Sequence, residues 1–335
     1  MKPRQFVPAF IVFVLIIALI PVFVGFNEYF ILLATVVLIY GVITTAWNVM
    51  GGIAGQLDLG ATAYLGIGAY VAGNMLIWWN ITPWIGMFVG AIIAAGFASA
   101  IGYVMFRYGV KEIWYALSTL GLVEVLRVIF MLWKEVGGPL EKYLPRSKTD
   151  PFYYMSFGSY IPYFYIALIF LLITFLVNYR LRYSKIGYSM LALGSNEDAA
   201  ESLGIDTRRT KLKGLFIYSF IVGAFGGFYA CFCSFIHPNT DFNMNFALEI
   251  AVLGIVGGLG TYYGPLLAAS ILVSLKEYLR AVFGTIVLGI YPAIFGLAII
   301  LIILFKPEGL SSILKNVYIK LRKGGGTKHG RQQHS

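Results

Sequence analysis

Five polar or charged side chains stand inside otherwise apolar stretches of the sequence. They are Gln56, Asp58, Glu124, Arg127 and Glu249. In a lipid bilayer an ionisable group costs about 2.5–3.5 kcal/mol on insertion scales, so each one needs a partner or a function. Glu124 and Arg127 are three residues apart, so they share a helix face and can pair with each other. We expect these side chains to line or gate a path through the membrane, or else to lock helix packing.

The residues that most often carry catalysis or bind metals form no cluster in this sequence. The histidines His237, His329 and His334 are dispersed and provide neither a metal-binding set nor a catalytic triad. Cys231 and Cys233 lie in an apolar run, which favours inert buried thiols. The sequence contains no G-x-x-x-x-G-K-[ST] phosphate loop. We therefore expect no enzymatic activity, no metal and no cofactor in this chain.

The composition places the chain in a membrane. Of its 335 residues, 59% are hydrophobic and only 12% are charged, and its mean hydropathy is +0.80. Soluble domains carry about 25% charged and about 45–50% apolar residues. These values exclude a soluble enzyme and a disordered protein, and two cysteines exclude a disulfide-stapled secreted domain. The expected surroundings are the lipid bilayer and other proteins, and not nucleic acid.

Apolar stretches long enough to cross a bilayer recur along the sequence. A transmembrane helix needs about 20 such residues. Stretches without any acidic or basic residue run over 5–27, 29–57, 59–106, 152–179, 214–240, 250–275 and 281–305. The stretch 59–106 holds two helices that separate near Pro83, and 113–133 adds a further span. The segment 244–280 is interrupted by glycines, so it counts as two passes or as a re-entrant pair.

Positive charge gives the direction of these passes, because cytoplasmic loops collect Lys and Arg. The densest basic segments, 180–213 and 306–331, hold seven such residues each, and both are placed in the cytoplasm. The loop 134–160 then lies outside. An all-α, polytopic bundle of about ten passes in the cell (inner) membrane, with both termini cytoplasmic, satisfies these placements. Residues 1–310 would form the transmembrane domain, with an uncleaved first helix, and 311–335 a basic, partly disordered cytoplasmic tail.

Two glycine-rich segments predict breaks in helices at membrane depth. Their glycines are Gly51, Gly52, Gly55 and Gly60 in the first, and Gly257, Gly258 and Gly260 in the second. Glycine allows close backbone approach, and irregular backbone in a membrane persists only where protein or water satisfies its polar groups. We predict discontinuous elements that face a pore or a subunit interface. The alternative is simple close packing of helices through small residues.

The basic loop 180–213 predicts a short helix that lies parallel to the membrane. The residues of this helix are Ser195, Glu197, Asp198, Ala199, Ala200, Glu201 and Gly204. Ser195 with Asp198 approximates a capping box, acidic residues occupy the first turn, and Gly204 ends the helix. A helix of about two turns needs a surface to pack against. It is either an ordinary amphipathic connector or a helix that inserts into a groove of a cytoplasmic partner.

This segment resembles the EAA-type coupling loop of ABC-importer permeases, in the form found in branched-chain amino acid permease subunits of the LivM/LivH type. Four further stretches are similar to the same family. They are the glycine-rich run 51–70, the helix around Glu124 and Arg127, the run from Glu249 to Thr261, and the ending 305–310. The resemblance covers about residues 45–310. Asp58 departs from the family pattern, which usually has a small hydroxyl side chain there, and its charge would alter the substrate or pair with a partner subunit.

The resemblance implies a type II ABC-importer-like fold and an ATP-driven import of branched-chain amino acids. It also implies the partners, namely a second, LivH-like permease, two cytoplasmic ATPase subunits that bind ATP and Mg²⁺, and an external or periplasmic solute-binding protein. The short helix of the basic loop would transmit closure of the ATPases to the spans. The loop 134–160 and the turns near Asp241 and Lys276 are candidate contacts for the solute-binding protein.

Three alternatives stay open on the sequence alone. A permease of the same class for urea, short amides or a sugar fits the composition equally well. An ion-coupled secondary transporter would use Asp58, Glu124 and Glu249 as coupling sites, but it gives no role to the helix in the basic loop. A membrane-embedded enzyme would need a converging cluster of His, Asp or Ser residues, which the sequence lacks.

Overall fold

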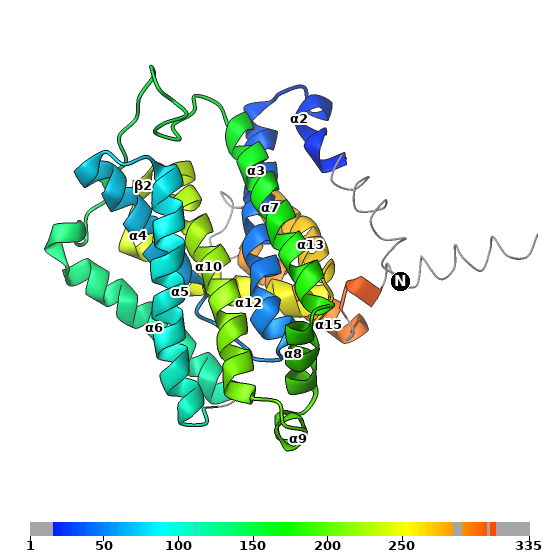
Figure 1. Ribbon diagram of the computed structural model, residues 1–335. Helices are drawn as coiled ribbons and strands as arrows, with labels where there is room; N and C mark the ends of the chain where they lie inside the picture. Colours follow the sequence, from blue (N-terminus) through cyan, green and yellow to red (C-terminus); the bar gives the residue numbers. More distant parts are fainter. Residues whose placement is uncertain (1–15, 111, 284–289, 307–308, 313–335) are drawn as a thin grey trace, which may run out of the picture.

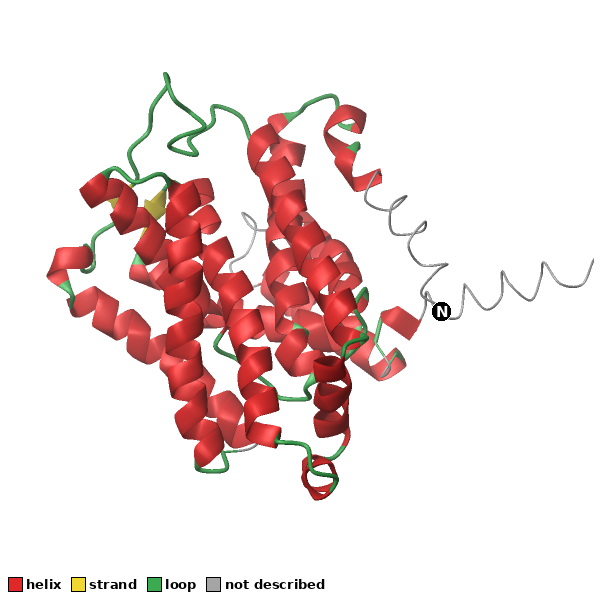
Figure 2. Cartoon of the chain, viewed as in Figure 1, coloured by secondary structure: helices red, strands yellow, loops and turns green. Residues whose placement is uncertain are grey.

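Helices are the main element of the structure that the computed structural model describes, namely residues 16–110, 112–283, 290–306 and 309–312 (Figures 1 and 2). One antiparallel pairing, between β1 (Lys142–Tyr143) and β2 (Phe235–Ile236), is the only sheet in these residues. The all-α prediction is therefore confirmed. Residues 5–15 of the predicted first span lie outside the described residues, and so do both termini and the basic tail from residue 313 onward. Pro307 and Glu308 of the closing motif are also outside them.

The described helices are joined by short connections, except for the long loop between α6 and α7. In chain order they are α2 (Ile20–Phe23), α3 (Glu28–Trp47), α4 (Ala61–Trp79), α5 (Pro83–Arg107), α6 (Glu112–Leu132), α7 (Ile161–Arg182), α8 (Lys185–Ser195), α9 (Glu197–Ser202), α10 (Thr207–Cys233), α11 (Pro238–Asp241), α12 (Met244–Gly257), α13 (Gly264–Ala268), α14 (Ser274–Phe283) and α15 (Ile290–Phe305). Two π-helical turns, η1 (Val49–Ile53) and η3 (Ala269–Val273), follow α3 and α13, and a 3₁₀ turn, η2 (Lys134–Val136), follows α6.

Five helices of the described part are long and apolar enough to cross a membrane. They are α3 with its continuation η1, and α5, α6, α7 and α10. The shorter helix α15 is apolar over Pro292–Phe305. The fold is thus a polytopic helical membrane bundle, as predicted.

The predicted helix breaks occur where the sequence places them. Asn80 ends α4 in the left-handed conformation (φ 52°). α5 then begins at Pro83, where the missing N–H of proline is tolerated in a first turn. The segment 244–280 likewise divides into α12 and α13. Gly258 and Gly260 separate these helices, and both have positive φ.

The long loop between α6 and α7 lies at one end of the bundle, and α8 and α9 lie at the other (Figures 1 and 2). At the loop end, the Tyr160 amide donates to a Glu28 carboxylate oxygen at the start of α3 (2.9 Å). The Tyr153 hydroxyl donates to the Asn80 carbonyl at the end of α4 (2.7 Å). The external and cytoplasmic loops predicted from charge therefore occupy opposite ends of the molecule.

Small residues hold α4, α5 and α10 closely together at the centre of the bundle. A Cβ atom added to Gly68 would overlap the Gly223 carbonyl, and one added to Gly226 would overlap the Leu65 carbonyl. Lipid supplies no hydrophobic drive between helices, so close backbone contact through small residues must supply the attraction. These three helices therefore pack with their backbones close together, and the remaining elements lie around them.

Candidate functional site

The short helix α9 stands at the end of the bundle opposite the long loop (Figure 1). Asn196 caps it, since its side-chain oxygen accepts a hydrogen bond from the Ala199 amide at 2.9 Å. At the other end, Gly204 has φ +84°, and the Ile205 amide donates to the Ala200 carbonyl at 3.1 Å. This is the glycine-ended helix terminus that the sequence predicts.

The predicted cap of this helix was wrong by one residue. Ser195 still belongs to α8, and its hydroxyl donates to the Leu191 carbonyl one turn earlier (2.9 Å). The chain becomes extended only at Asn196 (φ −162°), so this side chain is the one that reaches back over the first turn. As a result α9 runs over Glu197–Ser202 and is shorter than the predicted two turns.

An ion pair fixes α9 to the start of α10. The Lys211 ammonium lies 2.7 Å from a Glu197 carboxylate oxygen, and the Lys211 side chain is only 4% exposed. Its ammonium also lies 5.4 Å from the centre of the Phe106 ring on α5. On α9 itself Ala200 is buried against the bundle, whereas Leu203, which follows the helix, is 82% exposed. One side of α9 is therefore anchored and the other is open.

α8, the helix that precedes α9, contacts the first glycine-rich segment backbone to backbone. A Cβ added to Gly55 (φ +67°) would lie only 2.5 Å from the Cα atom of Gly194. Gly194 stands two residues before the cap Asn196. α8, which leads into α9, is therefore in direct backbone contact with the chain that follows η1.

The two glycine-rich segments meet each other inside the chain. A Cβ added to Gly52 would lie 2.7 Å from the Gly260 nitrogen, and one added to Gly260 would lie 2.9 Å from the Gly52 oxygen. Asn48 donates to the Thr261 carbonyl at 3.2 Å and to the Asn178 side chain of α7 at 3.3 Å. Both predicted breaks are thus present, and a buried amide pair joins them to α7.

Other glycines of these segments serve close packing, the alternative that the sequence left open. Gly51 and Gly254 leave room for the indole ring of Trp47, which a Cβ at either position would overlap. The same indole N–H donates to the Asp58 carbonyl at 2.6 Å. Gly257 similarly admits the backbone of Gly264 at the start of α13.

Asp58 lies in a fully buried cluster of hydroxyl groups. Its carboxylate accepts hydrogen bonds from Tyr115 of α6 (2.8 Å), from Tyr64 of α4 (3.2 Å) and from the Gly60 amide (2.7 Å). Gln56 is also buried. The Asp58 carboxylate therefore finds its partners inside the chain and not on a partner subunit. A role of Gln56 in a path through the membrane stays a prediction.

We expect replacement of Asp58 by alanine to lower the stability of the purified protein. The change leaves the buried hydroxyls of Tyr64 and Tyr115 without their acceptor, and each unsatisfied group costs about 1–3 kcal/mol. A thermal unfolding assay in detergent would measure the loss. Asp58→Asn, which keeps an acceptor oxygen, should lose much less. Unchanged stability of both variants together with impaired uptake would instead assign the carboxylate to transport.

Glu124 and Arg127 pair on α6, as their spacing predicts. The Arg127 Nε atom donates to a Glu124 carboxylate oxygen at 2.9 Å, and Arg127 also donates to the Asn239 side chain of α11 at 2.8 Å. The side chains of Glu124 and Arg127 remain 46% and 26% exposed, respectively. The pair therefore sits on an open face of α6 and not in the core.

Glu249 of α12 binds two partners that the sequence analysis did not assign to it. The Lys276 ammonium of α14 lies 2.6 Å from its carboxylate, and the Tyr40 hydroxyl of α3 donates to it at 2.7 Å. Lys276 is therefore paired and largely buried, and Asp241 is fully buried, with one carboxylate oxygen accepting from the His237 amide at 2.9 Å. These two side chains are thus held inside the chain, and contact of the turns near them with a solute-binding protein stays a prediction.

The loop 134–160 does present open apolar side chains. Leu140, Tyr143 and Phe152 are strongly exposed. Lys142 ties the loop to α4, since its ammonium donates to Asn74 at 2.8 Å, and partial burial lowers the pKa of this ammonium group. Contact of this loop with a solute-binding protein stays a prediction.

In the described residues no group of three or more His, Cys, Asp or Glu side chains could hold a metal ion. The structure brings further polar residues into these contacts that the sequence patterns do not single out, namely Asn48, Asn178, Tyr40, Tyr64 and Tyr115. The two asparagines carried a signal, because each is an amide within a stretch of apolar residues. The tyrosines did not, because aromatic side chains are common throughout this chain.

Comparison with known proteins gives consistent results. The family described as "Branched-chain amino acid transport system / permease component" matches residues 29–305. The high-affinity branched-chain amino acid transport system permease protein LivM of Escherichia coli K12 is 27% identical over 318 residues, which cover 87% of this chain and 72% of the relative. LivM of Salmonella typhimurium LT2 is 26% identical over the same shares. No solved structure matches the chain.

Proposed function

Because the chain belongs to the branched-chain amino acid transport permease family, we propose that it is a permease subunit of an ATP-driven importer for branched-chain amino acids. A second, LivH-like permease would complete the path, two cytoplasmic ATPase subunits would supply the work, and an external solute-binding protein would deliver the substrate. The names of the relatives support the substrate class. No role in ATP hydrolysis is assigned to this chain.

The observation that carries this proposal is the form of α9. A helix of six residues cannot persist in water without packing, yet only one side of α9 is packed, through Ala200 and the Glu197–Lys211 ion pair. Its other side exposes Glu201 and Leu203 at the end of the bundle. An apolar side chain beside acidic groups on an anchored helix suits insertion into a groove of a second protein.

The open face of α6 supports contact with a second permease or a water-filled path. Glu124 and Arg127 lie well inside a helix that is long and apolar enough to span the membrane. Partly exposed charges at that depth are costly in lipid, even when they pair. We therefore assign this face of α6 to the interface or the path between two permeases.

Photo-crosslinking from Leu203 tests the role of α9. A benzophenone amino acid at this position should crosslink to an ATPase subunit in the assembled importer, because the side chain faces away from the bundle. Leu140 is the matched control, since it is a leucine of similar exposure (72%) at the opposite end. Crosslinks to the ATPase from Leu140 and none from Leu203 would refute the coupling role.

Leucine uptake into proteoliposomes tests the energy source. Vesicles that contain the complete importer and the solute-binding protein should take up leucine only with ATP, and a protonophore should not stop the uptake. Uptake that follows an ion gradient without ATP would favour a secondary transporter. Uptake of urea or a sugar in place of leucine would keep the class of importer and change the substrate.

A further inference from the structure

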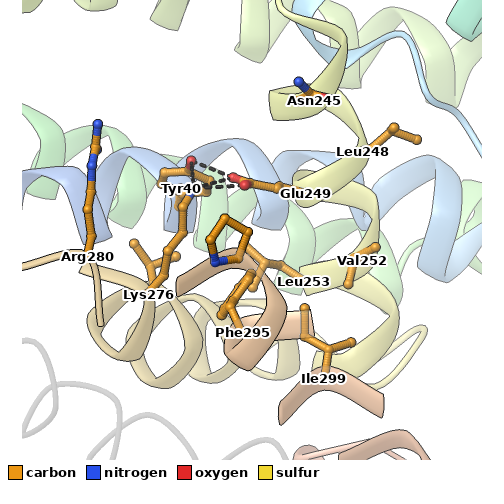
Figure 3. Close-up of a pocket in the computed structure, with 12 residues that line it drawn as sticks. Tyr40, Asn245, Leu248, Glu249, Val252, Leu253, Lys276, Arg280, Phe295 and Ile299 are labelled. Carbon is orange, nitrogen blue, oxygen red and sulfur yellow. Dashed lines mark hydrogen bonds and ion pairs between the residues drawn. The ribbon is translucent and has the colours of Figure 1, made fainter. Parts of the chain in front are cut away.

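A cavity of about 540 Å³ opens between α3, α12, α14 and α15 (Figure 3). Small-molecule sites usually enclose about 300–1,000 Å³, so its size suits one small ligand. Tyr40 on its wall lies twelve residues after the start of α3, which is about 18 Å along a helix with a rise of 1.5 Å per residue. In a hydrocarbon core of about 30 Å this depth is close to the middle of the membrane.

The cavity has a polar layer formed by facing turns of α12 and α14. Glu249 accepts from the Lys276 ammonium at 2.6 and 2.8 Å, and the Tyr40 hydroxyl joins both groups. Asn245 lies one helical turn before Glu249, and Arg280 lies one turn after Lys276, and both line the same cavity. Figure 3 shows Glu249 and Tyr40 directed toward each other from opposite walls.

An apolar layer lies one turn further along each helix. Leu253 on α12 and Val273 before α14 continue the walls beyond Glu249 and Lys276, and Phe295 and Ile299 of α15 close the cavity (Figure 3). The cavity therefore has a charged end and an apolar end, and it extends over about two helical turns.

The charges restrict the class of ligand. Lys276 and Arg280 are cationic, and Glu249 is anionic. Among the described residues the ion pair of the Arg280 guanidinium is a long one, with Glu277 at 3.9 Å, and the Arg280 side chain is 63% exposed. A purely anionic ligand would meet Glu249, and a purely cationic one would meet both cations. Glu249 and Lys276 already pair with each other, so a ligand that enters between them must replace both partners without changing the net charge. A ligand that carries one charge of each sign does so, with its cation on Glu249 and its anion on Lys276 and Arg280.

We propose that this cavity binds a zwitterionic α-amino acid with a short branched apolar side chain. The ligand ammonium would bind Glu249 and the Asn245 oxygen, and its carboxylate would bind Arg280 and Lys276. Its side chain would occupy the layer of Leu253, Val273 and Ile299. This inference rests on the proposed function and locates a substrate site within one chain.

A smaller side chain in the apolar layer tests the site, because it should improve the binding of a larger amino acid. Misfolding cannot produce such a gain. In the complete importer, Leu253→Ala should shift the competition between phenylalanine and leucine by about tenfold toward phenylalanine, a change typical of pocket size. Ile250→Ala is the matched control, because Ile250 is buried like Leu253 and lies on the same helix but does not line the cavity. Leu253→Trp should weaken leucine uptake and leave the amount of protein in the membrane unchanged.

Direct binding separates the amino acid from a lipid headgroup of similar charge. Radiolabelled leucine should bind the importer in nanodiscs of phosphatidylcholine, and Glu249→Gln should weaken this binding about tenfold or more through loss of a charge-assisted bond. Adding phosphatidylethanolamine should leave leucine binding unchanged. If this lipid displaces leucine, or if Leu253→Ala leaves the competition ratio unchanged, the site is overturned while the importer proposal stands. Absence of ATP-driven leucine uptake by the parent importer would instead reject the proposed function.

Discussion

We expect exchange of Glu197 for lysine to abolish ATP-driven leucine uptake while the chain still inserts into the membrane. The new ammonium would face Lys211, which is 4% exposed and has its carboxylate partner at 2.7 Å. Breaking such a largely buried pair costs on the order of 3 kcal/mol. A helix of six residues is not stable without packing. Once the ion pair is lost, α9 should therefore detach from α10. Uptake by proteoliposomes, together with the amount of protein in the membrane fraction, measures the effect.

The double exchange Glu197→Lys with Lys211→Glu provides the control. It restores an ion pair in which the two charges have exchanged positions. It should therefore recover part of the uptake, although the contact of the Lys211 ammonium with the Phe106 ring is lost. Full activity of the single variant would show that anchoring of α9 is unnecessary. Failure of the double variant to recover any uptake would show that the sign of charge at residue 197, and not the pair, is what matters.

The division into spans was predictable because it depends on properties that are local in sequence. Absence of charge over about 20 residues marks a span wherever the rest of the chain lies. Proline at the start of α5 and glycine after α9 act within one turn of their own positions. The error at Ser195 shows the limit of this reasoning. Two neighbouring residues could both cap a helix, and only the backbone angle at Asn196 decided between them.

The pairings of the candidate site were not predictable, because they join residues far apart in the chain. Asp58 meets Tyr115 across 57 positions, Asn48 meets Asn178 across 130, and Tyr40 meets Glu249 across 209. Only the pair of Glu124 and Arg127, three residues apart, followed from spacing. The sequence therefore identified most of the polar residues within the membrane, whereas packing determined which of them became buried partners and which remained on an open face.

We expect replacement of Gly55 by alanine to uncouple ATP hydrolysis from leucine uptake. The added Cβ would lie 2.5 Å from the Gly194 Cα atom, so two backbone segments must separate. Positive φ adds about 1–2 kcal/mol of strain for any L-residue. This contact joins α8, the helix before α9, to the segment after η1. When the contact is lost, the ATPases should still hydrolyse ATP, but the spans should no longer move in response. Assays of ATP hydrolysis and uptake on the same proteoliposomes measure the ratio.

A variant at Gly25 separates the effect of backbone strain from the effect of the lost contact, because its φ angle is almost the same as that of Gly55. Gly25 has φ +61°, and nothing lies within 4 Å of a Cβ built there. Gly25→Ala therefore introduces similar strain without a clash, and it should lower thermal stability slightly while uptake per ATP stays near that of the parent protein. If both alanine variants lose uptake equally, strain alone explains the defect. A selective loss at Gly55 would instead place the backbone contact with Gly194 on the route from α9 to the membrane spans.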